Sequence, residues 1–140
     1  MIVVDASVAA KWVLDEPGSE AATALLDSSD PLCAPDLLRI EGAGAISRRL
    51  RTGRLDPEEA RERIESWLEL VGRGVLELVP SGALIQSAAD LSVELRHPLV
   101  DCLYVALAIQ RSADLVTADA VLARRAAPSW PRVRLLATDR

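Results

Sequence analysis

The sequence predicts an α/β protein, a three-layer α/β/α sandwich built around a central, mostly parallel sheet. Short apolar strand candidates alternate with helical segments along the chain, and this alternation is typical of a parallel sheet that is covered on both faces. The 140 residues fit one domain, residues 1–140, and half of them are hydrophobic. Neither a repeat nor a long linker interrupts the pattern, so we expect a single hydrophobic core.

The expected elements follow from apolar periodicity and from turn residues at their ends. The strands are expected at residues 1–4, 32–34, 75–79, 115–117 and 133–137. The helices are expected at residues 7–14, 37–50, 57 to 72 or 74, 82–95 and 98–110, with a short helix from residue 120.

The helix that begins at Pro57 has the clearest signals in the chain. Asp56 is expected to cap it, Pro57 suits the first helical position, and Glu59 completes a capping box. Its apolar stripe consists of Ala60, Ile64, Trp67, Leu68 and Val71.

Composition indicates an intracellular chain that does not enter a membrane. No apolar stretch reaches the roughly 20 residues that a membrane span needs, and the N-terminus has no charged leader. Cys33 and Cys102 lie in apolar surroundings without a partner at zinc-ligand spacing. We therefore expect buried free thiols and a cytoplasmic location.

The charge pattern leaves two interpretations open. The net charge of −5 argues against a nucleic-acid partner, yet four arginines gather in the segment SRRLRTGR: Arg48, Arg49, Arg51 and Arg54. They are either a solvated helix face or contacts for RNA phosphates, which arginine suits better than lysine.

Four carboxylates are the candidate functional residues. Asp5 and Asp119 each follow a predicted strand, and sites in parallel sheets form beyond the carboxyl ends of the strands. Glu41 and Asp101 instead lie inside apolar helical segments, where an unpaired carboxylate is costly. Helix capping is the alternative for Asp5 and Asp119, and Asp101 stands in a first helical turn where an anion is favoured.

A divalent cation explains the four acids together. Crowded carboxylates repel one another and raise one another's pKa, whereas Mg²⁺ or Mn²⁺ prefers hard oxygen ligands. His97, the only histidine, is expected at the surface or in the core, so zinc and iron are poor candidates. Ser7 and Thr117 supply hydroxyls close to the acids in sequence.

The segments VVDAS, LLRIE, VDCLYVALA and LVTAD resemble, in order and spacing, the four acidic motifs of the PIN domain. They are most similar to those of the ribonuclease toxins of VapBC-type toxin–antitoxin pairs. The resemblance implies that Asp5, Asp101 and Asp119 ligate or orient the metal and that Glu41 helps directly or through water. It also implies that Thr117 steadies the strand end and that Ser7 lies at the pocket rim.

By the same resemblance, the chain would be a Mg²⁺-dependent endoribonuclease and the toxin of a type II pair. Its partners would be RNA, a cognate VapB-like antitoxin and a second copy of itself in a homodimer. Two positions depart from the pattern, because Gly44 stands where many relatives have Asn and Val100 where many have Tyr. Both departures concern substrate contacts more than metal binding.

Two other classes of function remain open at this point. An aspartyl-phosphate phosphatase or phosphoacceptor domain also uses an acid after the first strand, although this chain has DAS there and a single lysine, Lys11. A catalytically idle PIN-like interaction module is the other alternative, and loss of one of the four acids would favour it.

Overall fold

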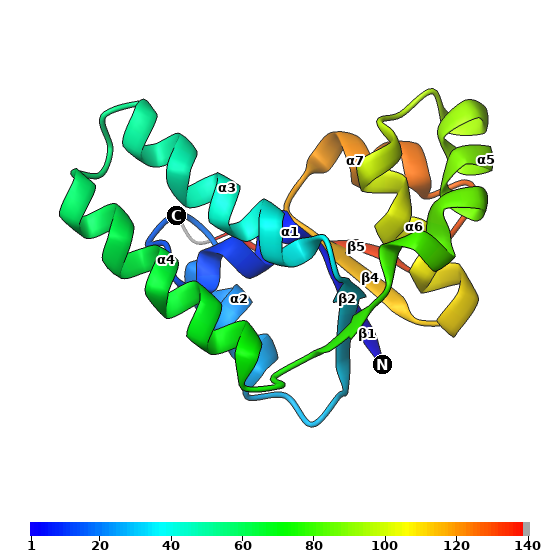
Figure 1. The fold of residues 1–140 in the computed structure, drawn as a ribbon. Helices are drawn as coiled ribbons and strands as arrows, with labels where there is room; N and C mark the ends of the chain where they lie inside the picture. The colour runs from blue at the N-terminus through cyan, green and yellow to red at the C-terminus, as the bar shows by residue number, and fades with distance from the viewer. Residues whose placement is uncertain (139–140) are drawn as a thin grey trace.

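The computed structural model describes residues 1–138 and has a five-stranded sheet at its centre (Figure 1). The strand order is β3-β2-β1-β4-β5, and every neighbouring pair is parallel. The strands are β1 Ile2–Val4, β2 Leu32–Pro35, β3 Glu77–Val79, β4 Asp114–Thr117 and β5 Val133–Leu135. The predicted α/β class with a parallel sheet is confirmed, and all five strands lie within one or two residues of the expected ranges.

Helices connect the strands and account for most of the remaining chain. They are α1 Ala6–Ala9, η1 Ala10–Trp12, α2 Ser19–Leu26, α3 Leu38–Arg51, α4 Pro57–Gly72, η2 Ser81–Leu84, α5 Ile85–Leu95, α6 Leu99–Arg111 and α7 Ala120–Ala126. The capping box of α4 is confirmed, since Asp56 accepts from the Glu59 backbone and the Glu59 side chain accepts from the Asp56 backbone.

The order in which successive strands join the sheet reverses at its centre. The chain moves from β1 through β2 to β3 toward one edge and then returns to β4 and β5 on the other side of β1. Because parallel crossovers are right-handed, the helices from α1 to α4 lie on one side of the sheet and α5 to α7 lie on the other (Figure 1). The carboxyl ends of β1 and β4 therefore border the point at which ligands bind in open parallel sheets.

Three helical segments differ from the sequence prediction. The helix expected over residues 82–95 begins as the 3₁₀ turn η2 and becomes α-helical only at Ile85. The helix expected over residues 7–14 is one α-helical turn followed by a 3₁₀ turn. Helix α2 was not predicted, because Pro17 and Gly18 signal a loop, and Gly18 indeed has a left-handed φ of 91°. The helix is held by a tertiary contact, in which the Trp12 indole donates to the Ala22 carbonyl at 2.9 Å.

Helices α3 and α4 form an antiparallel pair that projects from the sheet (Figure 1). Trp67 of α4 is fully buried against α3 and donates its indole N–H to the Arg39 carbonyl at 2.9 Å. A Cβ atom on Gly42 would lie 2.1 Å from Cζ2 of Trp67, so only glycine permits this approach. The contact fixes α3, the helix that carries Glu41 and the arginine segment.

Helix α6 supplies much of the core, and Cys102 at its start is buried, as is Cys33 of β2. The apolar run of α6 is not buried throughout, since Leu99, Val100 and Ile109 are between 38% and 42% exposed. Within residues 1–138, no helix has the length and apolar character needed to span a membrane.

Candidate active site

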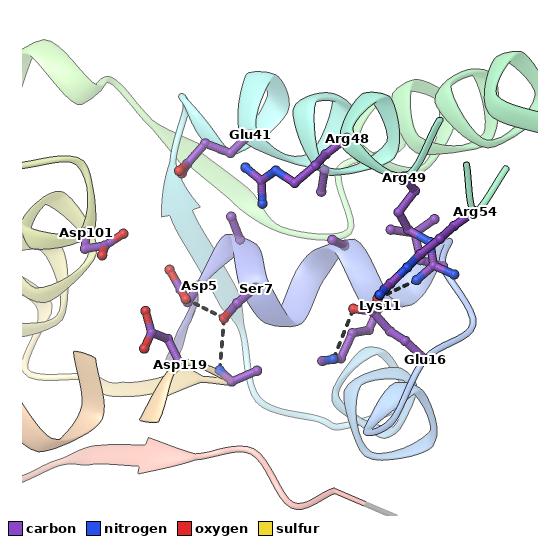
Figure 2. Close-up of a pocket in the computed structure, with 15 residues that line it drawn as sticks. Asp5, Ser7, Lys11, Glu16, Glu41, Arg48, Arg49, Arg54, Asp101 and Asp119 are labelled. Atoms are coloured by element: carbon purple, nitrogen blue, oxygen red, sulfur yellow. Dashed lines mark hydrogen bonds and ion pairs between the residues drawn. The ribbon is translucent and has the colours of Figure 1, made fainter. Parts of the chain in front are cut away.

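The four acids predicted from the sequence line one pocket. Asp5 follows β1, Glu41 lies on α3, Asp101 on α6 and Asp119 after β4, and the pocket has a volume of about 510 Å³. Figure 2 shows the carboxylates of Asp5, Asp101 and Asp119 pointing into a common space that Glu41 approaches from α3. The placement agrees with the sequence prediction; the catalytic and metal-binding roles stay predictions.

Asp5 is the most deeply buried of the four and is held by two hydroxyl groups. Ser7 Oγ donates to Asp5 Oδ2 at 2.5 Å, and Thr117 Oγ1 donates to the same oxygen at 2.8 Å. Burial raises the pKa of Asp5; the two hydroxyl hydrogen bonds oppose that rise, and the charge of Asp101 adds to it. Asp5 stands at the N-cap position of α1, but its side chain makes no capping hydrogen bond there.

Thr117 and Ser7 also bind the chain that follows β4. The Asp119 backbone N–H donates to Thr117 Oγ1 at 3.0 Å, and the Ala118 backbone N–H donates to Ser7 Oγ at 2.9 Å. The two hydroxyls thereby connect the end of β1 to the end of β4. Their supporting roles at the site stay predictions.

Glu41 is anchored by a buried tyrosine of helix α6. The hydroxyl of Tyr104, a fully buried residue of α6, donates to Glu41 Oε1 at 2.6 Å. Burial raises the pKa of Glu41, the Tyr104 hydrogen bond opposes this, and the charges of Asp5 and Asp101 add to it. Tyr104 was not singled out from the sequence, because it occupies an ordinary core position on an apolar helix.

Asp101 has a buried histidine partner, His97, which does not itself line the pocket. His97 is 6% exposed, and its Nε2 lies 2.7 Å from Asp101 Oδ2. Arg125 of α7 approaches the other ring nitrogen, with 3.2 Å between Nη1 and Nδ1. Because a guanidinium can only donate, Nδ1 accepts, and the imidazole proton at Nε2 points at Asp101. The four-residue spacing of His97 and Asp101 was the available sequence signal.

Asp119 caps α7, as the alternative interpretation predicts. Its Oδ1 accepts from the backbone N–H groups of Val121 at 2.9 Å and Leu122 at 3.2 Å. The residue also lines the pocket. A capping role through one oxygen therefore coexists with a place in the acidic group.

A common pattern relates the four acids. The hydrogen bonds found within residues 1–138 go to a single oxygen of each carboxylate: Oδ2 of Asp5, Oε1 of Glu41, Oδ2 of Asp101 and Oδ1 of Asp119. The second oxygen of each is left for another ligand. Among residues 1–138, no group of three Asp, Glu, His or Cys side chains lies close enough together to hold a metal ion by itself.

The other end of the same pocket is basic. Lys11, Arg48, Arg49 and Arg54 line it together with Glu16 (Figure 2). Arg51 is not among the lining residues, so the structure divides the predicted arginine cluster. Lys11 and Glu16 were not predicted as site residues, because their place depends on the way α1 and α2 pack against α3.

A parallel sheet with an acidic pocket at its topological switch point defines a class of α/β proteins rather than one family. The PIN domain family model matches residues 2–128, so the chain belongs to the PIN domain family. PIN domains are typically nucleases. A comparison with curated proteins gives no match.

Two solved structures are similar to this chain. The crystal structure of PAE2754 from Pyrobaculum aerophilum has a TM-score of 0.66 and 18% identity, covering 96% of this chain and 88% of that one. The crystal structure of FitAcB from Neisseria gonorrhoeae has a TM-score of 0.61 and 18% identity, covering 98% of this chain and 97% of that one. At these identities the likeness establishes the fold.

Proposed function

We propose that this PIN domain is a metal-dependent endoribonuclease and acts as the toxin of a type II toxin–antitoxin pair. One observation carries the nuclease assignment. Four carboxylates from four separate segments line one pocket, and each is held through one oxygen while the other is left for a ligand. Such an arrangement is poised to hold a cation rather than to stabilise the fold.

The chemistry of these donors fits Mg²⁺ or Mn²⁺. Within residues 1–138, no Lys or Arg forms an ion pair with any of the four acids, and the charge of Asp101 raises the pKa of both Asp5 and Glu41. Mg²⁺ keeps several waters and binds through one or two carboxylates plus substrate phosphates. This mode does not require three side chains to enclose the ion, which agrees with the spacing of the acids.

In this proposal Asp5, Asp101 and Asp119 hold the cation, and Glu41 assists directly or through water. The bound cation would supply a reactive hydroxide and stabilise charge on the phosphodiester. The protein contributes preorganisation: Ser7 and Thr117 orient Asp5, the Tyr104 hydroxyl orients Glu41, and His97 orients Asp101.

The nuclease proposal is tested with single-stranded RNA and the Asp101→Asn variant. We expect Mg²⁺ or Mn²⁺ to raise the melting temperature of the wild-type protein, because ligand binding stabilises the folded state. Asp101→Asn should reduce both this shift and metal-dependent RNA cleavage. A melting curve that millimolar metal leaves unchanged, with no heat of binding by calorimetry, would count against a shared metal site.

The acidic pocket also predicts a pH dependence for the metal-free protein. The folded state raises the pKa of Asp5 above its ordinary value of 3.8, so the folded protein retains a proton that the unfolded chain has lost. The free energy of unfolding contributed by Asp5 is therefore full below about pH 4 and is lost as the pH rises through the folded pKa. Urea unfolding in EDTA should show the wild type losing stability relative to Asp5→Asn over that interval. Parallel pH curves would contradict the prediction.

The antitoxin partner is proposed from the motif resemblance and from an exposed apolar groove. The groove lies along α3 and α4, where Leu37, Ile40, Ala43 and Leu68 contribute to its walls, and Ile40 is 77% exposed. Expression of the chain alone should arrest growth, whereas co-expression of a neighbouring open reading frame should relieve it. We also propose a homodimer, which sedimentation of the purified protein tests.

The two alternative classes find less support. Receiver-type phosphoacceptor chemistry places a lysine beside the acids, whereas Lys11 pairs with Glu16 at 3.1 Å. An idle interaction module remains the outcome if the purified protein binds neither metal nor RNA.

A further inference from the structure

The basic end of the pocket is assembled from three segments of the chain. Lys11 belongs to η1, Glu16 precedes α2, and Arg48 and Arg49 belong to the last turns of α3, while Arg54 follows that helix. Figure 2 shows Lys11, Glu16, Arg49 and Arg54 on the opposite side of the pocket from Asp101 and Asp119, whereas the Arg48 side chain points toward Glu41. Lys11 stands six residues after Asp5, on the 3₁₀ turn that continues α1.

Glu16 bridges two of the cations. Its Oε1 lies 3.1 Å from Lys11 Nζ, and its Oε2 lies 2.8 Å from Arg49 Nη1. The three side chains are between 11% and 27% exposed, so the bridge is partly shielded from solvent. A carboxylate held between two cations in this way occupies the position that a bound anion would take.

The backbone holds Glu16 in place. Its N–H donates to Ser19 Oγ at 3.0 Å, and Ser19 Oγ donates to the Leu14 carbonyl at 2.8 Å. The turn between η1 and α2 is thus built around this residue, and Glu16 is not a freely moving surface side chain.

Several cationic groups at the basic end are not paired with Glu16. Within the described residues, Arg48 and Arg54 form no ion pair, and Nε of Arg49 is buried without an acceptor. A buried donor without an acceptor is costly and calls for a structural explanation. Four cationic side chains accompanied by one carboxylate leave an excess of positive charge at this end of the pocket.

We propose that the basic end is a phosphate subsite in which Glu16 competes with a backbone phosphate of the bound strand. The nature of the ligand rests on the proposed ribonuclease function: one phosphodiester lies at the acidic end, and a neighbouring phosphate of the same strand lies against Lys11 and Arg49. Glu16 keeps the two cations in position when RNA is absent and weakens the binding of the strand. Glu16 therefore lowers the affinity of this subsite for RNA.

Direct binding in EDTA tests this subsite without metal or cleavage. A fluorescein-labelled, single-stranded RNA is titrated with wild type, Glu16→Gln and Asp15→Asn by fluorescence anisotropy. Asp15 is the matched control, because it is exposed, adjacent and outside the pocket, and its change removes the same charge. We expect Glu16→Gln to bind roughly fivefold more tightly at low salt, as removal of a charge at contact distance implies, and Asp15→Asn to bind like the wild type.

The salt dependence gives a second readout. Engagement of one further phosphate should steepen the plot of log affinity against log salt by about 0.7 for Glu16→Gln. Lys11→Gln and Arg49→Gln should each weaken binding severalfold, and melting curves check that all four variants are folded. Equal binding by Glu16→Gln and Asp15→Asn overturns the proposal, and so does weaker binding by Glu16→Gln, which would make Glu16 only an organiser of the two cations.

The test separates failure of the subsite from failure of the proposed function. If Glu16→Gln tightens RNA binding in EDTA but the wild type cleaves no RNA with metal, the subsite stands and the nuclease proposal fails. If metal-dependent cleavage is found but Glu16→Gln leaves RNA affinity unchanged, the nuclease proposal stands and the competition by Glu16 is refuted.

Discussion

The two ends of the pocket are built in different ways. At the acidic end, buried donors from distant parts of the chain hold the carboxylates, as Thr117 holds Asp5 and Tyr104 holds Glu41. At the basic end, Arg48 and Arg54 are exposed, and one carboxylate, Glu16, bridges the partly buried Lys11 and Arg49. The acidic end is thus preorganised, as catalysis requires, whereas the basic end can adapt to a flexible strand.

The largest effect on stability is expected from removing a donor at the acidic end. Thr117→Val keeps the shape of the side chain but leaves Asp5 with one hydroxyl donor, and the Asp119 backbone N–H loses its acceptor. We expect a loss of about 2 kcal/mol in the free energy of unfolding. Urea denaturation in EDTA measures it, and Thr117→Ser, which keeps the hydroxyl, is the control. A loss below about 0.5 kcal/mol would show that the acidic end is not held by this contact.

Substitutions of Asp119 distinguish its capping role from its proposed catalytic role. Asparagine caps a helix about as well as aspartate, so Asp119→Asn should leave stability unchanged while metal-dependent RNA cleavage falls about tenfold, or about 1.4 kcal/mol in the barrier. Asp119→Ala should in addition cost about 1 kcal/mol of stability. Cleavage by Asp119→Asn at the wild-type rate would remove this residue from the site and leave a three-acid group.

His97 tests whether orientation of Asp101 matters separately from its charge. His97→Leu removes the N–H that points at Asp101, whereas His97→Gln can present an amide N–H at a similar position. We expect His97→Leu to lower metal affinity, measured by calorimetry, by about fivefold, the factor for one hydrogen bond of ~1 kcal/mol. The glutamine variant should recover most of it. Similar affinities for leucine and glutamine would contradict the orienting role.

The smallest effect is expected for single arginines at the adaptable end. Arg48 lines the pocket and Arg51, on the same helix, does not. Arg48→Ala should reduce the salt slope of single-stranded RNA binding by about 0.7, the value for one phosphate contact, whereas Arg51→Ala should not. Equal slopes for both variants would assign the whole segment to a solvated face or to a protein partner.

The sequence predicted the acidic end better than the basic end, for a physical reason. Asp5 follows β1 directly and Asp119 stands two residues beyond the end of β4. Because parallel strands bring their carboxyl ends together, local patterns suffice to place both residues. The partners of the acids escaped prediction, because Tyr104 and His97 have the sequence context of ordinary helix and loop residues.

Helix α2 and part of the basic end also escaped prediction because they depend on contacts between different segments. Helix α2 follows a Pro-Gly turn signal and depends on Trp12, which lies in another segment. Lys11 and Glu16 likewise acquire their place only when α3 packs beside them. Local sequence patterns therefore predict which residues stand at strand ends. Contacts between helices decide which other side chains line the same pocket, and local patterns do not show these contacts.

Strands β1 and β4 pair in the sheet but are made at very different times during synthesis of the chain. Asp5 and Thr117 are separated by 112 residues, and a ribosome adds about 5–20 residues per second. A nascent chain therefore carries Asp5 for roughly 6–22 s before the residue that holds it has been made. Throughout that interval Asp5 lacks its buried donor, so the growing chain cannot acquire the acidic pocket before the segment through Asp119 has been made.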